Sequence, residues 1–186
     1  VVAVPGGAVA FLGKTGMGKS TLAASFALGG AAFLTDDSLL IEETDDGCLA
    51  LPSHASLRLW TDSVDALVGD RTKQAATISY STKARLLAGD ALSHQVEALP
   101  LLAAFLLERE SAAEVTIRVL TGAERQMAWV NNSFLLDIED VGLLGQHFDW
   151  THRVAQAVPT FALDYPRHYG MLADVRSAVS RHAATL

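Results

Sequence analysis

The stretch GKTGMGKS, residues 13–20, combines residue types and spacing suited to binding phosphate. Gly13, Gly18, Lys19 and Ser20 satisfy the P-loop pattern G-x-x-x-x-G-K-[ST]. Glycines let backbone N–H groups turn toward phosphate oxygens, and a helix that begins here adds its partial positive charge. In such loops the lysine reaches the β- and γ-phosphates, and the hydroxyl residue binds Mg²⁺. We therefore predict an ATP and Mg²⁺ site formed by Gly13, Thr15, Gly16, Met17, Gly18, Lys19, Ser20 and Thr21.

Two adjacent aspartates, Asp36 and Asp37, end an apolar run soon after this motif. We expect residues 31–37 to form a buried strand beside the P-loop strand, because ligands gather at the carboxyl ends of such strands. Neighbouring side chains on a strand diverge, so the two carboxylates suit different roles. One of the two is predicted to hold Mg²⁺ or its water, and the other to accept the proton of an attacking hydroxyl. The alternative is a solvated turn that caps the next element.

The flanking segments predict the elements that must position these groups. Residues 8–13 are predicted to form a buried strand, and residues 19–28 a helix that ends at Gly29-Gly30. Two apolar runs within 39–52 predict a hairpin that turns at Asp46-Gly47. Residues 56–60 predict a strand, and residues 61–69 a short helix capped by Thr61 or Asp62.

The second half of the chain mixes strands with helices. Segment 70–95 is polar and is a candidate mobile or substrate-facing region, with 78–87 as its strand-like part. Further strands are predicted at 100–108, 114–120 and 159–166. Helices are predicted at 121–134, opened by a capping box at Thr121 and Glu124, and at 140–157 and 171–183. The pattern predicts one α/β domain, residues 1–186, built on a mixed sheet.

Composition excludes several classes of protein. The net charge of −7 argues against a nucleic-acid binder. No apolar run reaches the eighteen or so residues of a membrane span. A single cysteine, Cys48, rules out an internal disulfide and fits a cytoplasmic location. The chain begins without Met, so we expect a processed or truncated N-terminus.

Cationic and aromatic residues outside the motif provide further candidates. Lys83 and Arg85 alternate on one predicted strand face that meets either solvent or an anion such as phosphate or an acidic peptide. Arg167 lies in a Pro- and Gly-marked loop; a surface position is the simpler interpretation, and contact with a transferring phosphate is the alternative. Trp60 and the other two tryptophans, Trp129 and Trp150, are expected in the core.

Residues 11–37, FLGKTGMGKSTLAASFALGGAAFLTDD, resemble the HPr kinase/phosphorylase family and its shorter HPr-kinase-like relatives. The resemblance implies a phosphoenolpyruvate-carboxykinase-like P-loop fold and ATP-dependent phosphorylation of a serine on a protein or peptide. By position it implies Asp37 as proton acceptor, Lys19 as phosphate lysine and Ser20 as magnesium hydroxyl, with Asp36 supporting metal or phosphate. Weaker likenesses in LRLW, STKARLL and DYPRHYGMLADVRSAV extend it over most of the chain. Shorter relatives look linked to ribosomally made peptides such as lasso-peptide precursors.

Two departures from the family keep other functions open. The family's upstream histidine has no counterpart in residues 1–18, and its glutamate has only Asp62 or Arg58 as loose counterparts. One alternative is a small-molecule P-loop kinase, which the predicted hairpin argues against. The other is a nucleotide-binding regulatory module with little turnover. The expected partner is a protein or peptide that carries a serine, with no nucleic acid or membrane; a homo-oligomer remains open.

Overall fold

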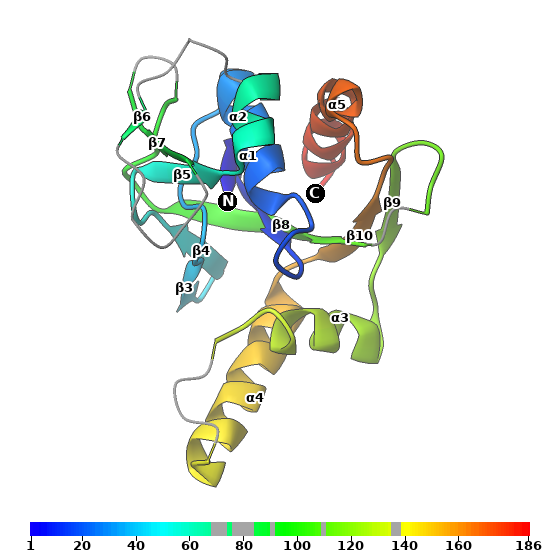
Figure 1. The fold of residues 1–186 in the computed structure, drawn as a ribbon. Coiled ribbons are helices and arrows are strands. Elements are labelled where there is room, and N and C mark those ends of the chain that lie inside the picture. The colour runs from blue at the N-terminus through cyan, green and yellow to red at the C-terminus, as the bar shows by residue number, and fades with distance from the viewer. Residues whose placement is uncertain (68–73, 76–83, 90–91, 109–110, 135–138) are drawn as a thin grey trace.

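The computed structural model describes residues 1–67, 74–75, 84–89, 92–108, 111–134 and 139–186. Its main sheet has the strand order β1 (Val2–Val4), β2 (Gly7–Leu12), β8 (Leu99–Leu107), β10 (Thr160–Asp164) and β9 (Thr116–Val119). β2, β8 and β10 run parallel to one another, whereas β1 and β9 are antiparallel to their neighbours. The predicted α/β class with a mixed sheet is therefore confirmed (Figure 1).

Two smaller groups of strands extend this framework. The hairpin of β3 (Leu40–Thr44) and β4 (Gly47–Leu51) pairs with the start of β8. A separate sheet has the order β5 (Ser56–Leu59), β7 (Ala84–Leu87) and β6 (Gln74–Ala75), with antiparallel pairing throughout. A short helix, α2 (Thr61–Leu67), follows β5 and packs against α1 (Lys19–Leu28). Of these elements, β5 and α2 line the same cavity as the P-loop.

Helices cover both faces of the main sheet, which explains why β2 is apolar at every position. Val9 and Phe11 point into a cluster shared with α1 and with α5 (Leu172–Ala183). Ala8 and Ala10, on the opposite face, join a cluster with side chains of α3 (Gly122–Val130) and α4 (Val141–Ala157). Figure 1 shows the two helix pairs on opposite sides of the sheet. None of the helices in the described part is long and apolar enough to cross a membrane.

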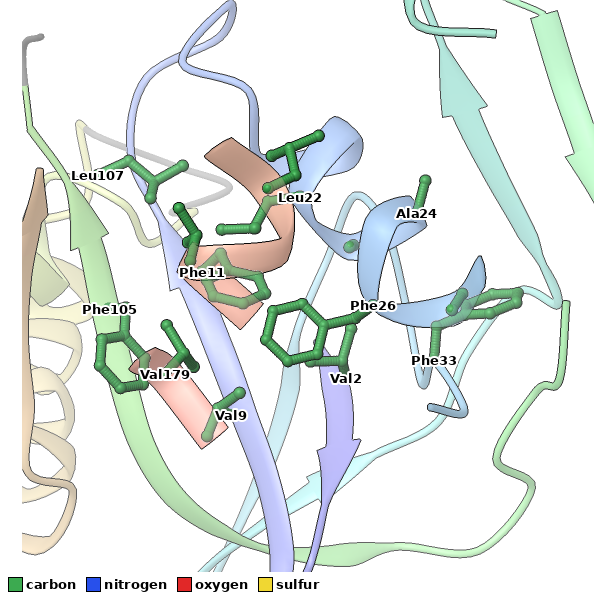
Figure 2. Packing of buried hydrophobic residues seen from close by; sticks show 14 of the residues in the cluster. Val2, Val9, Phe11, Leu22, Ala24, Phe26, Phe33, Phe105, Leu107 and Val179 are labelled. Atoms are coloured by element: carbon green, nitrogen blue, oxygen red, sulfur yellow. The ribbon is translucent and has the colours of Figure 1, made fainter. Parts of the chain in front are cut away.

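Aromatic side chains fill the core beneath the P-loop helix (Figure 2). Phe11 lies between Phe26 and Phe105, with ring centroids 5.6 and 6.3 Å away. Phe33 is fully buried and meets the His94 ring edge-on at 5.0 Å. The core thus joins the P-loop helix, the central strands and the segment that precedes the aspartates.

Most of the predicted elements are confirmed, including the helix that ends at Gly29-Gly30 and the strands at 8–13 and 159–166. The hairpin forms, but its turn residues are Asp45 and Asp46, and Gly47 already belongs to β4. Within 78–87 only β7 lies inside the described residues, and Lys83 lies outside them.

The prediction of a regular strand at 31–37 is wrong. Phe33 forms single bridges to Val2 and to His94, and the flanking residues are irregular. Backbone hydrogen bonds run from Ala3 N to Ala32 O (2.7 Å) and from Phe33 N to Ser93 O (2.9 Å). The segment is therefore extended but lies beyond β1, so β1 separates it from the P-loop strand. Because it is antiparallel to β1, it runs in the direction of β2 and still ends on the P-loop side.

The predicted capping box at Thr121 is also wrong in detail. Thr121 is the N-cap of α3 but makes no side-chain capping bond. The Glu124 carboxylate instead accepts two hydrogen bonds from Arg118, at 2.8 and 2.9 Å. A nearby guanidinium offers a charge-assisted bond and so outcompetes the neutral backbone donor. The helix ends at Val130 and does not continue through residues 131–134 as predicted, so Asn132 lies just beyond its last turn.

Replacing Phe33 with Ala tests how strongly the core holds the aspartate segment. Truncating this fully buried ring should lower the free energy of unfolding by about 3–5 kcal/mol in urea denaturation. Phe134 is 83% exposed, so its change to Ala is the matched control and should alter stability by no more than about 0.5 kcal/mol. Equal losses in the two variants would contradict the assigned core.

Candidate functional site

A cavity of about 570 Å³ opens where the P-loop follows β2. Its walls are the P-loop residues 15–21, the aspartate pair, residues 58–63 of β5 and α2, and the loop that leads from β10 to α5. The volume suits a ligand of nucleotide size. The tertiary structure thus brings every predicted site residue except Gly13 to the lining of one cavity.

The P-loop has a backbone that only glycine adopts without strain. Gly16 and Gly18 have φ angles of 87° and 86°, in the left-handed region. Gly18 is the N-cap of α1, so the first N–H groups of the helix face the cavity side of the loop. The Lys19 ammonium lies across the loop, donating to the carbonyls of Gly13 (2.6 Å) and Lys14 (3.0 Å). This arrangement presents backbone donors and one cation to a phosphate.

Asn132 was missed by sequence reasoning, although it contacts the P-loop. Its side-chain oxygen accepts a hydrogen bond from Gly13 N at 2.8 Å, and its amide nitrogen donates to Ala128 O at 2.8 Å. The residue thereby ties the start of the loop to the end of α3. The available signal was the Asn131-Asn132 pair, which is typical of helix ends and argues against a helix continuing through it.

Asp36 is the less exposed member of the aspartate pair. Its Oδ2 accepts the backbone N–H of Arg58 at 2.7 Å, whereas its Oδ1 is a buried atom with no hydrogen-bond partner among the residues that the structure describes. Burial raises the pKa of Asp36, and hydrogen bonds from the Arg58 backbone and the Ser20 side chain oppose that rise. A buried carboxylate oxygen without a donor is costly, and a cation would relieve that cost.

Asp37 is the exposed member of the pair. Its Oδ2 forms an ion pair with Arg58 Nη1 at 2.8 Å, and both side chains are about half exposed (48% for Arg58 and 54% for Asp37). One strand residue, Arg58, therefore contacts both aspartates, through its backbone with Asp36 and through its guanidinium with Asp37. The two carboxylates face different surroundings, as the divergence of adjacent side chains predicts.

A hydroxyl network closes the cavity on its far side. The Tyr169 hydroxyl donates to Asp62 Oδ2 at 3.0 Å and lies 3.3 Å from Ser63 Oγ. Ser63 Oγ in turn lies 3.1 Å from Thr21 Oγ1. The network joins α1, α2 and the 3₁₀ turn η1 (Tyr169–Met171) across the cavity. Asp62, one of the loose counterparts for the family glutamate, is thus engaged in holding this wall together.

Two sequence interpretations change at this cavity. Arg167 is not a surface arginine: it is half-buried, lines the cavity and donates to Glu108 O at 2.6 Å. Its guanidinium also lies 3.9 Å from the centre of the Tyr165 ring. Trp60 is not a core residue, since it is 45% exposed and lines the cavity. Trp129 is buried as predicted.

The residues present fit a magnesium ion. Ser20 and Asp36 lie together, and the Asp36 Oδ1 needs a positive partner. No group of three or more His, Cys, Asp or Glu side chains suited to a metal occurs in the described part of the chain. Mg²⁺ does not require one, because it usually takes one or two protein oxygens together with substrate phosphates and water.

Comparison with known proteins gives one structural similarity. No family model matches the sequence, and no curated protein matches it. Among solved structures, the chain is similar to the structure of the Hpr(Ser) kinase/phosphatase from Coxiella burnetii. The match covers 99% of this chain and 93% of that one, with 14% identity and a TM-score of 0.47.

Replacing Asp36 with Asn should stabilise the protein at neutral pH. A pKa raised above the ordinary 3.8 means that the native state binds more protons than the unfolded state between the two pKa values. The parent therefore loses stability as the pH rises through that window, and the Asn variant does not. Urea denaturation should show the variant more stable at pH 7, with the gain vanishing below the ordinary aspartate pKa. Asp46→Asn, in the exposed β3–β4 turn, is the control and should not show this gain.

Trp60 should report nucleotide binding. Its exposed indole lines the cavity, so ATP with Mg²⁺ should change tryptophan emission in a saturable way. The response should disappear in Trp60→Phe. In Lys19→Met the midpoint should rise about tenfold or more, because a lost charge-assisted phosphate contact costs at least about 1.4 kcal/mol. A full response in Trp60→Phe would place the nucleotide elsewhere.

Proposed function

We propose that this protein is a Mg²⁺-ATP-dependent kinase that transfers the γ-phosphate to a serine of a protein or peptide. One observation carries the proposal: two aspartates in different environments share a cavity wall with the P-loop. Asp36 is half-buried beside Ser20, whereas the Asp37 side chain is 54% exposed. A P-loop alone supports only nucleotide binding, whereas the second carboxylate supplies a group that can accept a proton. The resemblance of residues 11–37 to HPr-kinase-like enzymes supports the same activity.

Each group in the cavity has a role in the transfer. Backbone N–H groups of residues 15–20 and the Lys19 ammonium bind the β- and γ-phosphates. Ser20 and Asp36 hold Mg²⁺, which neutralises charge on these phosphates when bound. Arg167, held by the Glu108 carbonyl, faces the same cavity and stabilises charge on the transferring group.

Asp37 acts on the acceptor. It accepts the proton of the serine hydroxyl as the hydroxyl oxygen bonds to the γ-phosphorus. The bond between that phosphorus and the bridging β–γ oxygen breaks, and ADP leaves with the bond's electron pair. Arg58, 2.8 Å from Asp37, orients the carboxylate and balances its charge before the proton arrives.

Sheet topology favours this kinase type over a small-molecule P-loop kinase. Kinases that resemble shikimate or gluconate kinase continue with helices on a parallel sheet. Here β1 lies beside the P-loop strand in antiparallel orientation, and the β3–β4 hairpin follows the aspartates. The proposed acceptor remains a serine in a protein or peptide, with a ribosomally made precursor peptide as one example.

Asp37→Asn tests the proposal directly. The amide cannot accept the proton, so phosphoryl transfer to serine peptides from labelled ATP should fall by about 10²–10⁴-fold. Nucleotide affinity, followed by Trp60 emission, should stay near that of the parent because the exposed ion pair contributes little to stability. Asp46→Asn is the control. Transfer at the parental rate in Asp37→Asn would exclude Asp37 as the base.

A further inference from the structure

A second, polar cavity of about 240 Å³ lies on the other side of the aspartate pair. Asp36, Asp37 and Arg58 line both this cavity and the larger one. A group bound in the second cavity would therefore lie next to Asp37 but outside the P-loop. The volume is below the usual range for drug-sized ligands and suits a single side chain or a similar group.

Arg85, from β7, is the distinctive residue of this cavity. It is half-buried, and its Nε donates to Ser56 Oγ at 3.1 Å. Within the residues that the structure describes, no carboxylate lies within ion-pair distance of Arg85, and its Nη groups have no hydrogen-bond partner. Arg58, by contrast, is paired with Asp37. A partly buried guanidinium without a counter-ion is unfavourable and binds anions with paired donors.

The pairing of β5 with β7 places two arginines opposite each other, which destabilises the folded protein when no ligand is bound. Arg58 and Arg85 are directly opposite each other in the antiparallel pair of β5 and β7. Like charges at such positions are destabilising. Asp37 neutralises one of the two cations, and the other is left facing the cavity. An anionic ligand would balance the second.

The remaining lining groups hold the cavity open. Ser53 Oγ donates to Thr35 Oγ1 at 2.7 Å, and Thr35 Oγ1 donates to Ser38 O at 2.8 Å. These bonds tie the segment that carries the aspartates to the loop after β4, so the hydroxyls serve that segment and leave Arg85 as the group for charge recognition. His54, on the same wall, offers an additional ring nitrogen.

We infer that the second cavity binds a carboxylate of the phosphoryl acceptor through Arg85, so that the substrate is a peptide with a carboxylate close to its serine. The inference rests on the proposed kinase function and names its substrate class. The serine hydroxyl would reach Asp37 while the neighbouring carboxylate bonds Arg85 across the shared wall. Arg85 is thus a specificity-determining residue.

The test compares phosphoryl transfer from Mg²⁺-ATP to matched peptide pools. Each pool has one central serine, with Glu or Gln at the flanking positions, and each is made with a free or an amidated C-terminus. Comparing the free with the amidated C-terminus shows whether the enzyme recognises a side-chain carboxylate or the terminal carboxylate. The parent enzyme should favour a carboxylate-bearing pool over its uncharged match by about tenfold or more in kcat/KM, mainly through KM.

Variants of Arg85 separate recognition from folding. Arg85→Gln should lose the preference while Trp60-monitored ATP binding and the melting temperature stay near those of the parent. Arg85→Glu should reverse the preference toward peptides with Lys beside the serine, which a purely structural role would not produce. Arg181→Gln, on an exposed position of α5, is the matched control and should keep the parental preference.

The outcomes distinguish this inference from the function on which it rests. Equal transfer to the Glu and Gln pools together with equal transfer to the free and amidated pools, or an equal loss for all pools in Arg85→Gln, would overturn the subsite and leave the kinase function standing. Failure to phosphorylate any peptide pool, with ATP bound, would refute the proposed function and the subsite together. Reversal in Arg85→Glu would support both.

Discussion

The hydrogen bond from the Arg58 backbone to the Asp36 carboxylate, at 2.7 Å, is the contact on which the site depends. It joins the irregular segment after Phe33 to β5, an element of a different sheet. The buried Phe33 and Leu34 hold the preceding segment in the core, and this bond fixes the aspartates themselves to β5. Asp36 thereby lies half-buried beside Ser20, and Asp37 meets the Arg58 side chain. Arg58 thus contacts both carboxylates, one through its backbone and one through its guanidinium.

Positively charged side chains gather around the two cavities, although the chain as a whole is negatively charged. The protein carries a net charge of −7, yet Lys19, Arg58, Arg85 and Arg167 gather near two aspartates. Cations so close together repel one another, and one buried Asp36 oxygen has no donor among the described residues. Both features are unfavourable in the protein by itself, and the proposed phosphates, Mg²⁺ and acidic acceptor would relieve them. Such strain is typical of sites organised for ligands rather than for stability.

Local patterns predicted much of the fold, and their failures have physical causes. The apolar run at 8–13 favours a strand, and the glycines at 29–30 favour a helix end, in almost any tertiary context. The run at 31–37 has a strand's composition, but only single bridges reach it from β1 and from His94. Whether a segment forms a regular strand depends on which sheet edge is free in the folded protein, and the local sequence does not encode that. Glu124 likewise satisfies a capping pattern until Arg118 offers a stronger bond.

The sequence by itself determined the phosphate loop and the two carboxylates, because glycine conformation and residue spacing are local properties. Only the tertiary structure decided which groups meet them. It brought Asn132 to Gly13, Tyr169 to Asp62, and Arg167 and Trp60 to the cavity wall. It also set Arg58 opposite Arg85, since register across strands far apart in the chain fixes which side chains face each other. The local motif thus defined the proposed phosphate site, and long-range pairing defined what surrounds it.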